Sequence, residues 1–415
     1  MLNLDRITNN FDELVKKILA TLPPSIWTST DTKFFDPAIG GGQFVGPVEQ
    51  RLREHGHSDE NIRSRVFGYE KGELYIRNAV NNYKLVGNYK KIAYEEVFGM
   101  NSQIKFDVVL GNPPYQSGNK SKGNKQWPKF ISKAVELTKD GGYTCMITPT
   151  GWASGGQNIP GGRGIIKDVF KHNQVTYINA NGITKKYFPE VSMDIGYFVL
   201  NKKPVTSPTP IELPDGMVEV DFSKVDFISP QLNKIDISIA NKVFFGNNET
   251  FEVSSWDHKI KKGKVKESKS ETEEFKFKHW VLGGTTANNY VMTWLNFENG
   301  DKKYPKVLFN IRNRYWQPYY DLEGINVVAQ GFDIRLTGTE KLEDLKSVFE
   351  SKLFTYISFW YQIHMKGFMK TNIAKAYPKL DLMRTWTDDQ IYEHFGINQE
   401  ERDKIDTVLG SINHS

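Results

Sequence analysis

Asn112-Pro113-Pro114-Tyr115 places two hydrogen-bond acceptors beside an aromatic ring, at a point where a strand must end. The apolar run Phe106 to Gly111 that precedes it is typical of a buried strand. Because proline has no N–H and cannot continue a strand ladder, the chain leaves the sheet at Asn112. The Asn112 amide oxygen and the Pro113 carbonyl then lie in a stiff loop at a strand's carboxyl end, where open α/β sheets bind ligands. Such a loop suits a planar substrate that carries an NH2 group.

A glycine-rich turn forms a second candidate site. The turn Asp36-Pro37-Ala38-Ile39-Gly40-Gly41-Gly42 follows a short apolar run, and its glycines accept positive φ and let a ligand approach the backbone closely. The helix that follows offers free N–H groups to an anionic carboxylate. The turn lacks the Lys-Ser or Lys-Thr of a phosphate loop.

Glu70 ends the next predicted strand, where dinucleotide-type sites place an acid on ribose hydroxyls. An ordinary solvated loop carboxylate is the alternative interpretation of Glu70. Gly-rich turns and double-proline turns are also common structural features, so each of the three motifs is weak evidence by itself.

The order of the predicted elements indicates a doubly wound, parallel α/β sheet. Helices are predicted over residues 11–22, 44–55, 72–83 and 127–137, and strands over 33–35, 66–69, 91–94, 106–110, 143–147, 175–178 and 195–200. Four prolines within residues 203–216 place a domain boundary there, which gives domains 1–204 and 205–415. In the second domain a helix is predicted over residues 342–365.

Composition narrows the class of protein. The net charge of 54 − 49 = +5 is mildly basic and compatible with a polyanionic partner. The single cysteine, Cys145, excludes a disulfide framework and a cysteine-based metal cluster, and the eight histidines lack metal-ligand spacing. The first residues lack an apolar signal core, and no apolar run approaches the roughly 20 residues that cross a bilayer. We therefore expect a cytoplasmic protein without metal or membrane.

In this order, the three motifs together resemble those of the S-adenosylmethionine-dependent amino-group methyltransferases, in particular the DNA N6-adenine methyltransferases. Asp36-Pro37-Ala38-x-Gly40-x-Gly42 resembles the family's cofactor motif, and Glu70 falls at its ribose-binding acid. Asp107 to Tyr115 resembles the catalytic motif with its leading strand. The family's gamma arrangement has the cofactor motif first, the catalytic motif second and a variable C-terminal region.

The resemblance implies a fold. It predicts a Rossmann-like methyltransferase domain, with a doubly wound, mostly parallel sheet and an antiparallel edge hairpin. A mixed α+β target-recognition region follows. The resemblance covers residues 5 to 202 and, more weakly, the C-terminal tail.

Three further positions are carried over from the family. Glu96 lies where the family places an acid, usually Asp, on the adenine of the cofactor, with Glu95 as a competitor, and Val97 would pack against the adenine face. Phe188, in Tyr187-Phe188-Pro189, matches the aromatic residue that stacks on the target base; a core phenylalanine is the alternative. The family's N-terminal Thr-Pro motif is degenerate here, since Thr8 is followed by Asn9.

The resemblance implies transfer of a methyl group from S-adenosylmethionine to a flipped-out adenine in double-stranded DNA, with a restriction endonuclease as a possible separate partner. RNA adenine or protein-glutamine amide methylation uses the same loop chemistry and remains an alternative. A catalytically silent DNA-binding subunit of a defence system is a further alternative, although such a module has no use for an intact Asn112 to Tyr115. The recognition sequence and the oligomeric state are not predicted.

The second domain carries weaker candidates for contacts with nucleic acid. Arg312 to Gln317 is either a base-reading loop or a packed core segment, and Lys366 to Asn372 is a further candidate. Five lysines between Lys259 and Lys266 could neutralise phosphates, although a solvated loop is the favoured interpretation. The tail from Trp386 to Gly396 is interpreted as structural, with Thr387 as a helix N-cap. No endonuclease or ATPase site is recognised.

Overall fold

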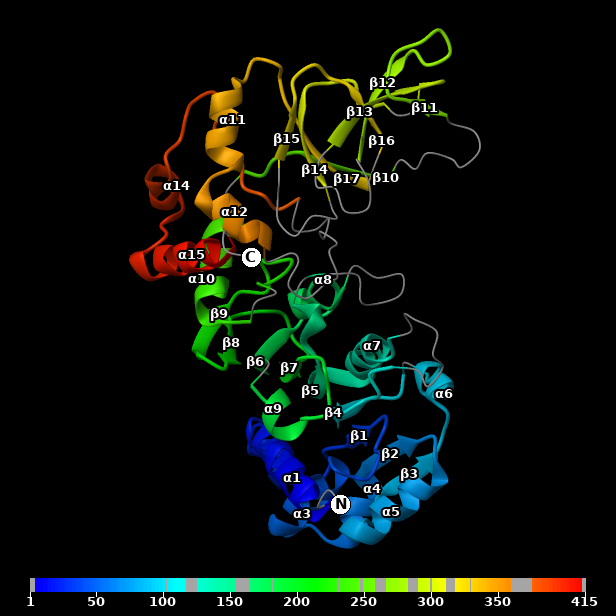
Figure 1. The fold of residues 1–415 in the computed structure, drawn as a ribbon. Coiled ribbons are helices and arrows are strands. Elements are labelled where there is room, and N and C mark those ends of the chain that lie inside the picture. The colour runs from blue at the N-terminus through cyan, green and yellow to red at the C-terminus, as the bar shows by residue number, and fades with distance from the viewer. Residues whose placement is uncertain are drawn as a thin grey trace. The chain divides into compact units, whose positions relative to one another are not determined.

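The computed structural model describes residues 4–101, 103–116, 125–153, 155, 164–180, 182–229, 232–246, 249–257, 266–282, 290–298, 301–310, 318–328, 330–359 and 375–412. The chain forms two compact units (Figure 1), Met1–Ile228 with Leu232–Lys234, and Ser229–Gln231 with Ile235–Ser415. Within the described residues, no helix combines the length and the apolar character that a membrane span requires.

The first unit is built on one mixed sheet. Its strands are β1 Phe34–Asp36, β2 Val66–Glu70, β3 Asn88–Lys91, β4 Phe106–Gly111, β5 Thr138–Pro149, β6 Gln174–Asn179, β7 Ile195–Asn201, β8 Thr209–Leu213 and β9 Gly216–Val220. They lie in the order β3-β2-β1-β4-β5-β7-β6-β8-β9. β1 is parallel to β2 and β4, β4 is parallel to β5, and β7 runs antiparallel between β5 and β6. The mostly parallel sheet and its antiparallel strands confirm the predicted Rossmann-like fold class.

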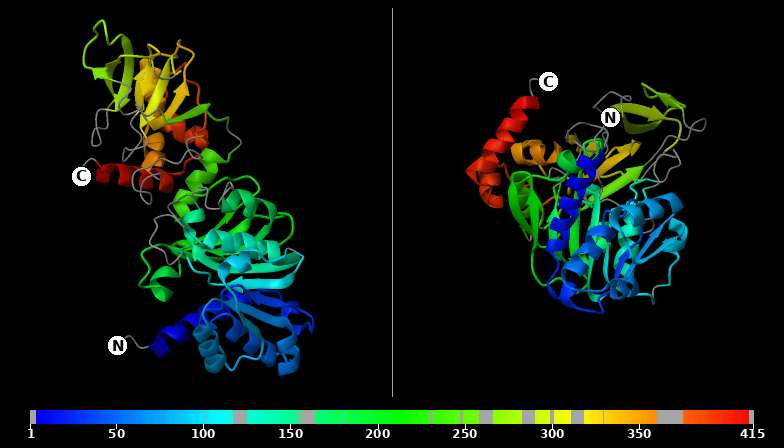
Figure 2. Two further views of the ribbon diagram at one scale, coloured as in Figure 1. Left: turned by 90° about the vertical axis from the view of Figure 1, so that its right-hand side faces the viewer. Right: turned by 90° about the horizontal axis from the view of Figure 1, so that it is seen from below.

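Helices cover both faces of this sheet. They are α1 Leu4–Ala20, α2 Ser25–Thr28, α3 Val45–Glu54, α4 Asp59–Arg65, α5 Glu73–Tyr83, α6 Tyr94–Phe98, α7 Trp127–Leu137, α8 Ile165–Asp168 and α9 Thr184–Tyr187, with short 3-10 turns η1 Thr150–Trp152 and η2 Phe170–His172. Residues from α1, α3 and α5 share one core with β1, β4 and β5, whereas α6 and α7 pack in a second cluster with Ala38. Figure 2 shows the same elements from two further sides.

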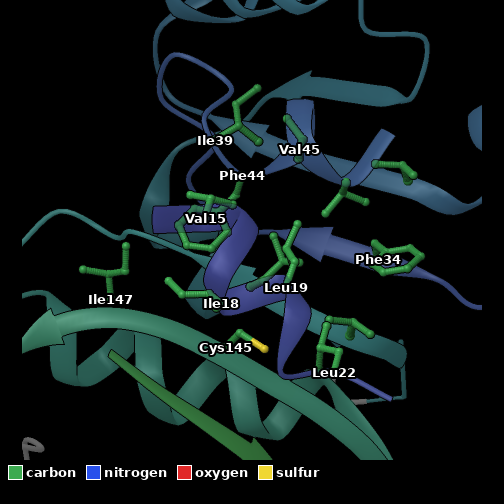
Figure 3. Close-up of a cluster of buried hydrophobic side chains, with 14 of the residues drawn as sticks. Val15, Ile18, Leu19, Leu22, Phe34, Ile39, Phe44, Val45, Cys145 and Ile147 are labelled. Atoms are coloured by element: carbon green, nitrogen blue, oxygen red, sulfur yellow. The ribbon is translucent and has the colours of Figure 1, made fainter. Parts of the chain in front are cut away.

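The largest core explains why α1 forms where it does. Leu14, Val15, Ile18 and Leu19 recur at helical spacing and are at most 1% exposed, so one face of α1 is apolar and buried. Figure 3 shows Val15, Ile18 and Leu19 in this cluster, together with Cys145 of β5. Burial raises the pKa of the Cys145 thiol to about 12. The cysteine is therefore a core residue.

The first unit extends further along the chain than the predicted domain 1–204. β8 pairs in parallel with β6, and β9 closes an antiparallel hairpin on β8, so both strands prolong the first sheet. The proline-rich segment 203–216 therefore lies within the unit and contains β8, and the compact unit continues to Ile228. A proline count alone cannot distinguish a connection between strands from a linker between domains.

Two other predicted elements differ from the structure. The strand predicted over 91–94 lies at Asn88–Lys91 instead: the Ile92 amide makes a last hydrogen bond to the Glu70 carbonyl of β2, and Tyr94 then opens α6. The single helix predicted over 342–365 is wrong as a continuous element. It is interrupted at Ser351, whose hydroxyl donates to the Val348 carbonyl and caps the start of the next helix.

The second unit is a mixed α+β fold. Its described strands form two four-stranded sheets, β10-β17-β14-β15 and β11-β13-β12-β16. The strands are β10 Val253–Asp257, β11 Glu267–Ser268, β12 Phe277–Leu282, β13 Tyr290–Leu295, β14 Lys306–Asn310, β15 Pro318–Asp321, β16 Asn326–Val328 and β17 Gln330–Arg335. The helices are α10 Lys234–Phe244, which begins in the first unit, α11 Leu342–Phe349, α12 Lys352–Phe359, α14 Asp388–Phe395 and α15 Gln399–Ile412.

Several expectations for the second unit concern residues whose structure is not described. Arg312 to Gln317, Lys366 to Asn372 and the lysines from Lys259 to Lys264 lie outside the described residues. Lys266 is described and forms an exposed ion pair with Glu274. Thr387 is confirmed as the N-cap of α14, since its hydroxyl accepts a hydrogen bond from the Gln390 amide at 3.2 Å.

Candidate active site at the carboxyl edge of the first sheet

The two predicted motifs meet at one point of the sheet. Asp36 ends β1 and Gly111 ends β4, and these two strands are parallel neighbours. The strand order reverses between them, since β2 and β3 continue on one side and β5 on the other. In open α/β sheets the crevice at such a switch point binds ligands. The fold therefore places both motifs where a bound molecule is expected.

The glycine turn after β1 has the backbone geometry that its sequence requires. Gly40 and Gly42 adopt φ values of +52° and +89°, which side chains with a Cβ rarely adopt. A Cβ on Gly42 would also lie 2.9 Å from the Cβ of Ala79. The turn is held by a hydrogen bond from the Ile39 amide to the Tyr69 carbonyl of β2, at 2.9 Å. α3 begins three residues later, at Val45.

Asp36 and Glu70 form a buried acidic pair beside this turn. Their side chains are 1% and 3% exposed, and neither forms an ion pair with a described residue. Burial raises the pKa of Asp36 to about 8, and the charge of Glu70 contributes in the same direction while the Ala38 amide opposes it. Glu70 accepts from the amides of Gly40, at 3.1 Å, and Gly72, at 3.2 Å. Two desolvated acids without a cation favour a positively charged ligand.

Gly111 brings the acidic pair into contact with the second motif. Its φ is +158°, and a Cβ at this position would lie 2.8 Å from Oδ1 of Asp36. The Asp36 carboxyl therefore lies directly against the backbone that leads into Asn112. Sequence analysis did not single out Gly111, because its role depends on a contact between two neighbouring strands.

The loop Asn112 to Tyr115 follows Gly111 without a break. Pro113 is buried, while Asn112, Pro114 and Tyr115 are partly exposed. The Tyr115 hydroxyl donates a hydrogen bond to Oδ1 of Asn112 at 2.9 Å. Because a carbonyl oxygen has two lone pairs, Oδ1 retains one acceptor site for a substrate N–H. Burial raises the pKa of Tyr115, so its hydroxyl stays protonated and remains a donor.

Glu96 and Val97 both lie on α6. Glu96 is exposed, and its carboxylate accepts from the Ala93 amide at 3.3 Å. Val97 is fully buried beside Ala38 and Phe130. Tyr94, which the sequence analysis placed in a strand, opens the same helix and belongs to the same apolar cluster. Burial raises its pKa, and the charges of Glu70 and Asp36 contribute, so this missed ring lies within their electrostatic influence.

Phe188 lies at the C-cap of α9 and is half-buried. Its ring packs edge-to-face on Phe11 of α1, with centroids 5.7 Å apart and an interplanar angle of 88°. Phe188 and Tyr115 both pack against the core that contains Ile39 of the glycine turn and Phe44, the N-cap of α3. The two aromatic residues predicted to hold the target therefore border one core, although they come from loops far apart in sequence.

The residues of this site fit S-adenosylmethionine. The glycine turn adopts positive φ values at Gly40 and Gly42, which residues with a Cβ rarely adopt. The unpaired acids Asp36 and Glu70 complement the cofactor's ammonium and sulfonium charges, and Glu70 retains lone pairs for ribose hydroxyls. Among the described residues, no cluster of three or more metal-ligating side chains is found.

The first unit has a Rossmann-like α/β fold. Residues 48–183 match the family model described as Eco57I restriction-modification methylase. Over 168 residues the chain is 30% identical to an uncharacterized adenine-specific methylase of Mycoplasma pneumoniae. That match covers 37% of this chain and 38% of the relative, so the chain spans well under half of the relative's length. Over this part of the chain, the resemblance to adenine methyltransferases is confirmed.

Solved structures show a weaker likeness. A methyltransferase subunit of a type I restriction-modification system from Streptococcus thermophilus is 15% identical, with a TM-score of 0.35 over 48% of this chain and 45% of that one. The type IIG restriction endonuclease BpuSI is 11% identical, with a TM-score of 0.42 over 95% of this chain and 60% of that one. Scores this low do not establish a shared fold by themselves.

Proposed function

We propose that this chain is a site-specific DNA adenine-N6 methyltransferase that uses S-adenosylmethionine. One observation carries the proposal: the buried acid of the glycine turn, Asp36, lies against Gly111, the residue that leads directly into Asn112. A cation held by that acid would lie beside a loop that presents two acceptors for an amine. The match of residues 48–183 to a restriction-modification methylase model supports the same assignment.

The chemistry of the loop follows from its two acceptors. The exocyclic amine of adenine is a poor nucleophile because its lone pair is delocalised into the ring. Hydrogen bonds from its two N–H groups to Oδ1 of Asn112 and to the Pro113 carbonyl favour a more tetrahedral nitrogen, whose lone pair is localised. The flanking prolines keep these acceptors fixed, so little reorganisation precedes reaction. When bound, S-adenosylmethionine supplies an activated methyl group for direct displacement.

No nucleophilic side chain or prior base is required. The amine loses its proton after the new N–C bond forms, so Asn112 need only orient and polarise it. Cys145, the sole cysteine, is fully buried and its pKa is raised to about 12, so it does not serve as a nucleophile. The site therefore acts by orientation and polarisation.

A base within a duplex must leave the stack to reach this loop, at a cost of a few kcal/mol. Stacking on Tyr115 and Phe188 would offset that cost by roughly 1–3 kcal/mol per base. The second unit, with its two small sheets, is the proposed target-recognition region. A restriction endonuclease acting separately is the proposed partner, and Glu96 and Val97 remain proposed cofactor contacts.

The assay that tests this proposal is methyl transfer from tritiated S-adenosylmethionine to duplex DNA, RNA and protein, followed by nucleoside analysis. We expect label in N6-methyladenine of DNA only. Label in RNA or in glutamine would assign the same loop to the alternative substrates. No transfer to any acceptor, with retained DNA binding, would identify a silent subunit. Methylation sequencing of DNA from expressing cells would then give the recognition site.

Asn112→Ala tests the central residue. We expect methyl transfer to fall by about 100-fold or more, because one acceptor of the amine is lost, while S-adenosylmethionine binding is retained. Asn82→Ala, at an exposed position of α5, is the matched control and should have wild-type activity. Single-turnover rates and equilibrium dialysis give the two quantities. Full activity of Asn112→Ala would contradict the assignment.

A further inference from the structure

Helix α1 touches both halves of the proposed site through one side chain. The ring of Phe11 packs edge-to-face on Phe188, at a centroid distance of 5.7 Å. On another side it packs edge-to-face on Phe44, at 6.5 Å and 78°. Phe44 is the N-cap of α3 and follows the glycine turn by two residues. Phe11 therefore bridges the cofactor turn and the ring proposed to stack on the target base.

A second contact fixes α1 to the glycine turn. The Tyr83 hydroxyl donates to Oδ1 of Asp12 at 2.8 Å. The Tyr83 ring lies against the turn and the start of α3, since a Cβ on Gly42 would be 3.1 Å from it and one on Gly46 only 2.3 Å. Phe11 and Asp12 are adjacent in α1, so the helix is held to the cofactor motif at two neighbouring positions.

Phe188 has little local support of its own. It follows α9, a helix of four residues, and its amide donates to the Thr184 carbonyl at 2.8 Å. Pro189, which comes next, has no N–H and cannot extend the helix. An exposed ion pair between Lys186 and Glu13 adds another link to α1, but exposed pairs hold side chains weakly. The edge-to-face contact with Phe11 therefore adds to the core packing that holds the Phe188 ring.

We propose that Phe11 is a positioning residue for base stacking: it orients the Phe188 ring and ties it to the helix that begins at the cofactor turn. This inference rests on the proposed function, since it concerns the same reaction. It assigns to α1 a role that does not depend on the degenerate Thr8-Asn9 pair. Phe11 itself contacts neither cofactor nor target in this scheme.

Three variants separate positioning from general stability. Phe11→Leu fills much of the space but removes the ring edge that meets Phe188, whereas Phe11→Tyr keeps the ring. Val15→Ala is the matched control. Val15 lies one turn further along α1 and is fully buried in the same core. Its truncation should therefore lower the stability of the fold by a comparable amount. All three are purified as the full chain, and thermal unfolding confirms that each folds.

The measurement uses duplex DNA with 2-aminopurine at the methylated position, which methylation sequencing of the wild-type product identifies. Fluorescence reports the flipped base in the presence of S-adenosylhomocysteine, and steady-state kinetics give kcat and the KM for DNA. We expect Phe11→Leu to raise the KM for DNA and lower the flipped fraction by about three- to tenfold, the range of an edge-to-face contact. Phe11→Tyr should restore both to within about twofold, and Val15→Ala should lower only the melting temperature.

The outcomes distinguish this inference from the proposed function. If the wild-type chain methylates DNA and Phe11→Leu behaves like Val15→Ala, the positioning role is overturned while the proposed function stands. An equal loss of S-adenosylhomocysteine affinity and of flipping in Phe11→Leu would show a collapsed site and would also overturn it. A wild-type chain that methylates no DNA would overturn both.

Discussion

Each of the two units buries a group of acids, and the surroundings of these groups differ. In the first unit Asp36 and Glu70 are nearly inaccessible and bond only to backbone amides among the described residues. In the second unit Lys306 is fully buried and pairs with Asp321 at 2.5 Å, and its ammonium also donates to three backbone carbonyls. Asp333 accepts from the Tyr304 hydroxyl at 2.8 Å.

The difference separates a binding site from a structural feature. Burying an unpaired charge costs desolvation free energy. A core that contains its own cation, as around Lys306, offsets that cost by ion pairing. The first unit leaves its acids without a cation, which is consistent with a positively charged ligand completing them. Removing the cation of the paired group should therefore lower the stability of the fold, whereas changing the acids that lack a cation should mainly lower ligand affinity.

The largest effect is expected at the paired group. Lys306→Met leaves Asp321 buried without its cation, and should lower the free energy of unfolding by about 3–5 kcal/mol. Urea denaturation measures the loss. Lys278→Met, which breaks the exposed pair with Glu323, is the control and should cost less than about 1 kcal/mol. Removing Asp321 as well, in Lys306→Met with Asp321→Leu, should recover most of the stability; no recovery would argue against a pairing effect.

A smaller effect is expected where the unpaired acid meets the catalytic loop. Gly111→Ala would place a Cβ 2.8 Å from Oδ1 of Asp36 in a strained backbone conformation. We expect a loss of about 1–3 kcal/mol in stability and at least a tenfold loss of methyl transfer. Gly141→Ala, at a φ of +78° with nothing within 4 Å of the added Cβ, is the control for a positive-φ substitution that makes no contact with the acid. Equal activity of the two variants would show that the Asp36 contact is unimportant.

Asp36→Asn should affect binding more than folding. It removes a carboxyl that could ionise beside a cationic ligand, so S-adenosylmethionine affinity should fall by about tenfold, or 1.4 kcal/mol. Stability without ligand should stay equal or rise, because burial raises the pKa of Asp36 to about 8 and the amide, unlike the carboxyl, stays neutral without binding a proton. Calorimetric titration and denaturation give both values. Asp107→Asn, which loses the salt bridge to Lys139, is the control and should leave affinity unchanged.

The smallest expected effect is the change of folding stability with pH. The folded-state pKa of Asp36 is raised from 3.8 to about 8, so the folded chain binds a proton more tightly than the unfolded chain. Its contribution to stability is therefore greatest at low pH and declines as pH rises through that interval, by at most about 1.4 kcal/mol per pH unit. Asp36→Asn should remove this slope from the denaturation curves. An unchanged slope would place the titration on another group.

The sequence predicts a structural element correctly where the residues of that element alone determine its conformation. The apolar run before Asn112 ends as β4 at Gly111, and the first motif follows β1, as their residues indicated. The prediction was wrong where pairing with a strand distant in sequence determines the conformation. Residues 209–220 form strands because β6 is available to pair, and Tyr94 opens a helix once the ladder to β2 ends. The roles of Gly111 and Phe11 depend on contacts across the sheet and between helices, which spacing along the chain does not reveal.

The lone, fully buried cysteine has a practical consequence. With its thiol pKa raised to about 12, Cys145 should be inert to maleimides in the folded chain. Cysteines introduced at the exposed Met217 of the first unit and Met383 of the second would then be the reactive thiols. The sequence thus already provides a clean background for fluorophore or spin labels, and distances between the two labels would report whether the units move when duplex DNA is added.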